Sequence, residues 1–180
     1  MALSIAVLGA TGMYARHLIP RFVARGYRVR ALVRRPETAA TAAACGAEVR
    51  RADIFDAASL RAGLEGCDVG VNLATSLPGP SGTGDYATND RLRREGTPIW
   101  IRACQEAGVP RVVQQSIAMV NAAAGEAWAD EDTVFPAGQE DTAALAIAAA
   151  LCDGGHGSPV GTRLGHPARC PLLRAGYGLR

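Results

Sequence analysis

Two glycines, Gly9 and Gly12, lie three residues apart directly after the apolar run at 5–8. Glycine is used where a side chain would not fit or where the backbone must turn sharply. A glycine-rich turn from a strand into a helix points several backbone N–H groups at one place, and the helix dipole there favours an anion. The segment therefore predicts a cradle for a diphosphate at residues 9–15, and an ordinary strand-to-helix turn is the alternative.

The second apolar run ends in a pair of arginines, Arg34 and Arg35. In dinucleotide-binding folds an acidic residue at this place holds the ribose hydroxyls of NAD, whereas an arginine accommodates the 2′-phosphate of NADP. Arginine suits this task because its planar guanidinium forms charge-assisted hydrogen bonds to phosphate. The pair favours NADP as the cofactor, with NAD as the alternative; two solvated surface charges are the competing interpretation.

Three later apolar runs end in residues that could contact the same cofactor. In "ADIFD", Asp53 and Ile54 could offer a carboxylate, backbone and an aliphatic side chain to an adenine, although Asp53 could equally terminate a strand. In "NLAT", the small residues would let a cofactor ring approach the backbone. The hydroxyl of Ser116 could face the nicotinamide and a substrate. Together these ends indicate one shared site more strongly than any single motif does.

These residues must be positioned by strands that alternate with helices along the chain. Strands are predicted at 5–8, 27–33, 47–53, 67–75 and 111–118, and helices at 13–25, 36–44, 56–64, 89–107 and 138–151. We expect Gly46 to cap the second helix, Asp56 to begin the third, and Pro98 either to kink the fourth or to start a new first turn. The pattern predicts an α/β fold, a Rossmann-like doubly wound parallel sheet in three layers. Ligands of this fold bind outside the carboxyl ends of the strands, where strand order reverses.

Composition narrows the function classes. The 180 residues are 48% hydrophobic and 20% charged with a net charge of +2, which argues against a dedicated nucleic-acid binder. No apolar run is long enough for a membrane helix, and a strand so close to the N-terminus leaves no room for a signal peptide. Five scattered cysteines without a C-x-x-C pair predict a reduced, cytoplasmic protein and no metal site. The expected partners are a dinucleotide and an unknown small-molecule substrate, and a homodimer is left open.

The quoted segments resemble the atypical and extended short-chain dehydrogenase/reductases, particularly the NmrA-like and NAD-dependent epimerase/dehydratase groups, over residues 1 to about 150. The resemblance is carried by "VLGATGMYA", "ALVRRP", "ADIFD", "VNLAT", "EAGVPRVVQQS" and "WADEDTVFP". In these groups a G-x-x-G-x-x-G/A pattern wraps the diphosphate, and Ala15 holds the third glycine position here. The resemblance implies cofactor contacts by Gly9, Ala10, Thr11, Gly12, Met13, Tyr14, Arg34, Arg35, Asp53, Ile54, Leu73, Ala74, Thr75 and Ser116.

The sequence departs from the family at its catalytic pair. Active members use Tyr-x-x-x-Lys after the fifth strand, where the lysine lowers the pKa of the tyrosine. That pair would fall near Asp141 and Leu145, and all 19 basic residues of the chain are arginine. Ser116 matches the family's catalytic serine but has lost these partners. Three functions stay open: an NADP-dependent oxidoreductase or epimerase-like enzyme, a non-catalytic NADP(H)-sensing regulator, and an inactive truncated remnant.

The C-terminal segment differs in character from the rest. Residues 152–180 are rich in glycine, proline and arginine, and they show neither helical nor alternating periodicity. The resemblance implies a further strand and a substrate-binding lobe at this place. We therefore predict an NAD(P)-binding domain at 1–151 and an irregular tail at 152–180. A flexible basic tail, a divergent lobe and a frameshifted or truncated C-terminus are the alternatives.

Overall fold

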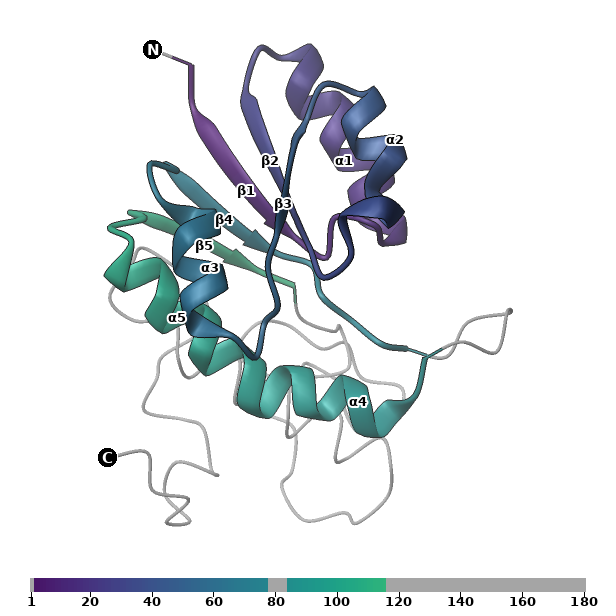
Figure 1. Cartoon of the computed structure of the whole chain (residues 1–180), viewed down its shortest axis with the longest axis vertical. Coiled ribbons are helices and arrows are strands. Elements are labelled where there is room, and N and C mark those ends of the chain that lie inside the picture. Colours follow the sequence, from purple (N-terminus) through teal and green to yellow (C-terminus); the bar gives the residue numbers. More distant parts are fainter. Residues whose placement is uncertain (1, 78–83, 116–180) are drawn as a thin grey trace, which may run out of the picture.

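The computed structural model describes residues 2–77 and 84–115, and Figure 1 shows their arrangement. Ser116, the helix predicted at 138–151 and the tail at 152–180 lie outside the described residues. The strands are β1 (Ser4–Leu8), β2 (Arg28–Val33), β3 (Glu48–Arg51), β4 (Val69–Asn72) and β5 (Arg111–Gln114). The helices are α1 (Met13–Ala24), the 3₁₀ helix η1 (Pro36–Ala39), α2 (Ala40–Ala44), α3 (Ala57–Leu64), α4 (Tyr86–Arg91), the π-helical turn η2 (Leu92–Gly96) and α5 (Thr97–Glu106).

The five strands form one parallel sheet in the order β3-β2-β1-β4-β5. In the centre of the sheet, Val7 of β1 lies between Ala31 of β2 and Val71 of β4. The chain moves outward from β1 to β3, then crosses back to β4 beside β1, so strand order reverses between β1 and β4. This topology confirms the predicted Rossmann-like α/β fold, and it places the switch point at the end of β1.

Each face of the sheet is covered by its own pair of helices, which makes three layers (Figure 1). On the α1 and α2 face, Val7 and Ile19 belong to one buried cluster. On the α3 and α5 face, Leu8 and Trp100 belong to a second cluster. Adjacent residues of β1 thus serve opposite faces, as strand geometry requires. Trp100 fits there because Gly70 carries no side chain: a Cβ would lie 2.9 Å from its ring.

β3, β4 and β5 end earlier than the sequence predicts, and the cause is the same in β3 and β4. β3 ends at Arg51 and β4 at Asn72, whereas the predictions extended to residues 53 and 75. The Asp53 carboxylate accepts a hydrogen bond from the backbone N–H of Phe55 at 3.0 Å, and Asn72 Oδ1 accepts one from Ala74 at 3.0 Å. Such side-chain bonds to the backbone two residues later replace the ladder by a turn. Both turns are thereby fixed directly after their strands, at the end of the sheet.

The helix predicted at 89–107 is longer and less regular than expected. It runs from α4 through the π-helical turn η2 into α5, and Pro98 lies in the first turn of α5. Pro98 therefore starts a new turn, which is the second of the two predicted alternatives. Within the described ranges, no helix is long and apolar enough to cross a membrane.

Candidate functional site

The turn between β1 and α1 brings the backbone unusually close to the β4 loop. Gly9 has a φ of +78°, and a Cβ on it would lie 2.8 Å from both the backbone nitrogen of Ala74 and the carbonyl carbon of Leu73. Both the conformation and the space therefore demand glycine at position 9. Gly12 donates its N–H to the Gly9 carbonyl at 3.0 Å, which closes the turn.

The N-terminus of α1 presents backbone donors with no side chain to satisfy them. Gly12 is the N-cap residue, and it provides no side-chain hydrogen bond. The first turn of the helix contains no acidic residue. The first N–H groups of a helix have no partner within it, and together with the helix dipole they attract an anion. This local arrangement is that of the predicted diphosphate cradle.

An open cleft with a cavity volume of about 180 Å³ lies at the carboxyl ends of the strands. Gly9 and Gly12 form its floor at the switch point, and Arg34 enters it directly after β2. The cleft also reaches Phe55, Thr88 and Leu92 on the side of α4 and η2. Of the residues predicted from the sequence, it brings together Gly9, Thr11, Gly12, Arg34, Asp53, Ile54, Leu73, Ala74 and Thr75.

Four predicted residues do not line this cleft. Ala10 is buried and faces a small hollow between α1 and α2. Met13 and Tyr14 are 72% and 67% exposed on the first turn of α1. Arg35 is the N-cap residue of η1, where its carbonyl accepts a hydrogen bond from Thr38 Oγ1 at 2.7 Å. Their cofactor contacts stay predictions.

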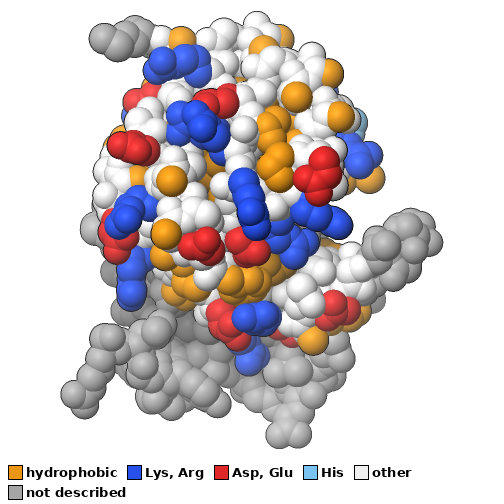
Figure 2. Space-filling view, viewed as in Figure 1, with side chains coloured by type: hydrophobic (Ala, Val, Ile, Leu, Met, Phe, Trp, Pro, Cys, Tyr) orange, Lys and Arg blue, Asp and Glu red, His pale blue; other side chains and the backbone are white. Residues whose placement is uncertain are grey.

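Arg34 is an exposed cation without an acidic partner. Within residues 2–77 and 84–115, none of the ion pairs involves its guanidinium. Arginine and acidic side chains lie interspersed over much of the face of the molecule seen in Figure 2. A single unpaired guanidinium at the end of β2 suits one phosphate group.

Asp53 and Ile54 shape the wall of the cleft after β3. Besides bonding to Phe55, Asp53 is held by its own backbone N–H, which donates to Ser59 Oγ at 3.1 Å. Ile54 is only 4% exposed, because it packs against the Gly96 backbone: a Cβ on Gly96 would lie 2.8 Å from it. The wall is therefore rigid, and the strand-terminating role considered for Asp53 is present in the structure.

The β4 side of the cleft depends on two asparagines that sequence reasoning did not single out. Asn72 is 1% exposed, and its Nδ2 donates to Gln114 Oε1 at 2.9 Å while its Oδ1 holds the N–H of Ala74. Asn89 is 2% exposed, and its Oδ1 accepts the N–H of Ser76 at 3.2 Å. Buried polar side chains with satisfied hydrogen bonds fix a unique arrangement. They hold in place the loop that Gly9 approaches.

Phe55 lines the cleft after β3, and a cation lies over its ring. The guanidinium carbon of Arg91 lies 4.3 Å above the centre of the Phe55 ring, and Arg91 also pairs with Glu95 at 2.9 Å. The sequence signal was Phe55 itself, an aromatic residue in a segment already predicted to meet the adenine. A half-buried ring beside an open cleft offers a flat apolar surface to a planar ligand.

Among the described residues there is no cluster of metal-ligating side chains, and Cys104 is a core residue. No group of three His, Cys, Asp or Glu side chains there could hold a metal ion. Cys104 is fully buried against Gly70, and burial raises the pKa of its thiol to about 12. It therefore stays protonated at neutral pH and acts as a core residue.

A parallel sheet with a glycine turn, an unpaired helix N-terminus and a cleft at its switch point defines a dinucleotide-binding domain of the Rossmann type. Comparison with known sequences assigns the family. Residues 9–150 match the family described as NAD(P)H-binding, and the chain belongs to it.

Two curated relatives are reductases. The chain is 34% identical over 113 residues to a 4-hydroxy-2-methyl-3-oxo-4-farnesyl-3,4-dihydroquinoline-1-oxide ketoreductase from Stigmatella aurantiaca, covering 61% of this chain and 32% of that protein. It is 34% identical over 134 residues to a 3-diazoavenalumate denitrifying reductase from a Streptomyces species, covering 71% and 42%. The chain thus spans well under half the length of these relatives.

A solved structure shares the fold. A short-chain dehydrogenase/reductase superfamily protein from Agrobacterium tumefaciens, with bound NAD, superposes with a TM-score of 0.65 at 23% identity over 85% of this chain and 43% of that one. This likeness shows the shared fold, and the matched family confirms the NAD(P)-binding domain implied by the resemblance over the N-terminal part of the chain; the NmrA-like grouping stays a prediction.

Proposed function

We propose that the chain binds NADP(H) in preference to NAD(H) in the cleft at the switch point, as the cofactor domain of an oxidoreductase. The observation that carries this proposal is the unpaired Arg34 directly after β2, where an NAD-binding domain would carry a carboxylate. The guanidinium would neutralise the 2′-phosphate, and the donors after Gly12 would hold the diphosphate.

The remaining assignments follow the course of the cleft. Asp53 and Ile54 would line the adenine, with Phe55 beside it, and the Leu73–Thr75 loop would border the nicotinamide. Ser116 comes two residues after the end of β5 in the sequence, and we assign it to the nicotinamide end as a hydrogen-bond donor to a substrate carbonyl. Bound NADPH would supply a hydride there. The division at residue 151 and a cytoplasmic setting are proposals as well; the latter is supported by the free thiols of Cys45, Cys67 and Cys104.

Titration of the full chain with NADPH and NADH tests the cofactor preference. One charge-assisted hydrogen bond contributes about 1.5–3 kcal/mol, so Arg34→Ala should weaken NADPH binding roughly ten- to a hundredfold. The NADH affinity of the variant should match that of the wild type, because NADH has no phosphate at this position. Equal NADPH affinities for Arg34→Ala and wild type would remove Arg34 from the site.

A second candidate function is reduction of a small substrate, because two relatives are reductases. The sequence contains no lysine, so a tyrosine would lack the neighbour that usually lowers its pKa. General acid catalysis typically contributes about 10²–10⁴-fold, and we expect very slow NADPH oxidation with quinones and aldehydes. The remaining alternative is an NADP(H)-sensing regulator of the NmrA-like type, which would bind the cofactor without turning it over.

Turnover at ordinary enzymatic rates would contradict this expectation. In that case Tyr14 and Tyr86 are the replacement acids to test, since both are exposed on helices that begin beside the cleft. Loss of activity in Tyr86→Phe, with retained NADPH affinity, would identify the acid.

A further inference from the structure

We propose that Arg16 is a second cation for the 2′-phosphate, so that the phosphate of NADP(H) lies between Arg34 and Arg16 beside the Thr11 hydroxyl. The proposal rests on the function proposed above and deepens it by adding a residue that determines cofactor specificity. Sequence reasoning did not single out Arg16, because it lies on a helix and not at the end of a strand.

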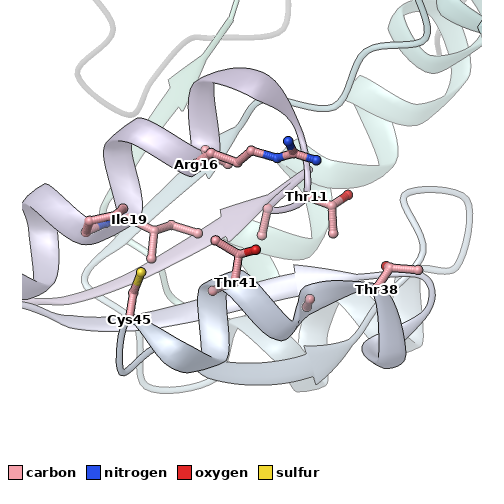
Figure 3. A pocket seen from close by; sticks show the side chains of 11 residues that line it. Thr11, Arg16, Ile19, Thr38, Thr41 and Cys45 are labelled. Carbon is pink, nitrogen blue, oxygen red and sulfur yellow. The ribbon is translucent and has the colours of Figure 1, made fainter. Parts of the chain in front are cut away.

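The geometry that carries the proposal is a hollow between α1 and α2, shown in Figure 3. Arg16 reaches along α1 toward the turn that carries Thr11, and Thr38 and Thr41 line the opposite wall. Thr11 lines both this hollow and the cofactor cleft, which Arg34 also lines. Thr11 therefore joins the hollow that Arg16 lines to the cleft that Arg34 lines.

The lining of the hollow suits an anion. It contains one cation and three threonines, and no acidic side chain is among its residues. Arg16 itself forms no ion pair or side-chain hydrogen bond with the described part of the chain. Its neighbour on the same helix behaves differently, since Arg21 Nη1 donates to the His17 carbonyl at 2.7 Å. Arg16 thus keeps its donors available for a ligand.

Thr11 decides where the phosphate would lie. It is the residue that lines both the hollow and the cofactor cleft. The phosphate would therefore sit where the hollow meets the cleft at Thr11. Thr38 Oγ1 already donates to the Arg35 carbonyl, so Thr38 can only accept, and the donors there are those of Thr11, Arg16 and Arg34.

The test is a fluorescence titration of the full chain with NADPH and with NADH, in wild type, Arg16→Gln and Arg34→Gln. Arg16→Gln should weaken NADPH binding about tenfold and leave NADH binding within about twofold, because only NADPH carries the phosphate. Arg25→Gln is the matched control: Arg25 is an exposed arginine at the other end of α1, and we expect both affinities to stay unchanged.

The outcomes separate this inference from the proposed function. A wild type that prefers NADPH, with the preference lost in Arg34→Gln but intact in Arg16→Gln, overturns the role of Arg16 and leaves the proposed function standing. Equal losses for NADPH and NADH in Arg16→Gln, with unchanged thermal stability, also overturn it, because the residue would then act on the shared part of the cofactor. A wild type without NADPH preference overturns both.

Discussion

The two ends of the sheet use arginine in opposite ways. At the amino end, Arg30 of β2 donates to Glu48 Oε2 at 3.0 Å and to the carbonyls of Gly63 and Glu65, each at 2.8 Å. At the carboxyl end, Arg34 comes four residues later and has no acidic partner in the described ranges. The first arginine completes the fold, while the second is left for a ligand. The residue type alone does not separate the two tasks; the partners do.

Two glycines, Gly9 at the carboxyl end of the sheet and Gly26 at its amino end, also differ in their surroundings. Their substitution gives the largest expected effect on the free energy of unfolding. Gly9 and Gly26 share a φ of +78°, but a Cβ would lie 2.8 Å from backbone at Gly9 and would meet nothing within 4 Å at Gly26. Gly26→Ala should lose about 1–2 kcal/mol from left-handed strain alone. Gly9→Ala should lose roughly 1–3 kcal/mol more, because the β4 loop must move.

Urea unfolding of both variants, with cofactor titration, measures this difference. Gly9→Ala should also bind NADPH and NADH poorly, since the displaced loop lies at the floor of the cleft. Gly26→Ala should bind both like the wild type. Equal losses of unfolding free energy in the two variants would mean that the close approach of Gly9 to Leu73 and Ala74 is not present.

Exchanging the two arginines of β2 for alanine should separate stability from binding. Arg30→Ala should reduce the free energy of unfolding by about 2 kcal/mol, because the carbonyls of Gly63 and Glu65 lose this donor and the Glu48 carboxylate keeps only Arg50. Cofactor affinity should not change. Arg34→Ala should show the reverse, with unchanged stability and weakened NADPH binding. A stability loss in Arg34→Ala would show that it has a structural partner.

How far the sequence could predict this molecule depends on whether the cause was local. The glycine turn, the parallel sheet and the Asp56 cap of α3 were predictable, because each follows from neighbouring residues. The Asp56 carboxylate accepts from Ala58 and Ser59 at 3.0 and 3.2 Å, as expected of an N-cap. The ends of β3 and β4 were not predictable, because hydrogen bonds to the side chains of Asp53 and Asn72 end these strands before their apolar pattern ends.

The supporting residues of the site were hidden for a different reason. Asn72 hydrogen-bonds to Gln114, which lies 42 residues later in the sequence. Arg16 lines a hollow that exists only because α2 packs beside α1. No spacing in the sequence records such contacts. The one signal for Asn72 was a polar residue inside an apolar run, which marks a buried hydrogen-bonded side chain as readily as an exposed one.

The Asn72–Gln114 amide pair at the carboxyl end of the sheet should contribute somewhat less to the free energy of unfolding than Arg30 does. Asn72→Ala removes the partner of Gln114 and the acceptor of Ala74, and we expect a loss of about 1–2 kcal/mol. NADPH and NADH affinities should fall by the same factor, because the loop serves both cofactors. A double-mutant cycle with Gln114→Ala should give a coupling of roughly 0.5–1.5 kcal/mol. A loss confined to NADPH would place Asn72 at the phosphate instead.

The smallest effect belongs to Glu48 at the amino end, and it depends on pH. Hydrogen bonding by Arg30 lowers the pKa of Glu48 from 4.5; burial opposes this shift, and hydrogen bonding by Arg50 adds to it. A carboxylate with a lowered pKa in the folded state stabilises the protein above pH 4.5, and this contribution disappears as the pH falls through the folded-state value. Because its side chain is 46% exposed, solvent screening limits the contribution to about 0.2–1 kcal/mol.

Comparing urea unfolding of wild type and Glu48→Gln from pH 7 down to pH 3 measures this contribution. The wild type should be the more stable protein at pH 7, and the two curves should converge in acid, where Glu48 is protonated and resembles glutamine. Added salt should narrow the gap at pH 7, because the pair is exposed. A gap of constant size across this range would show that Glu48 stabilises the strand pair by packing, and Arg30 would then be held mainly by the carbonyls of Gly63 and Glu65.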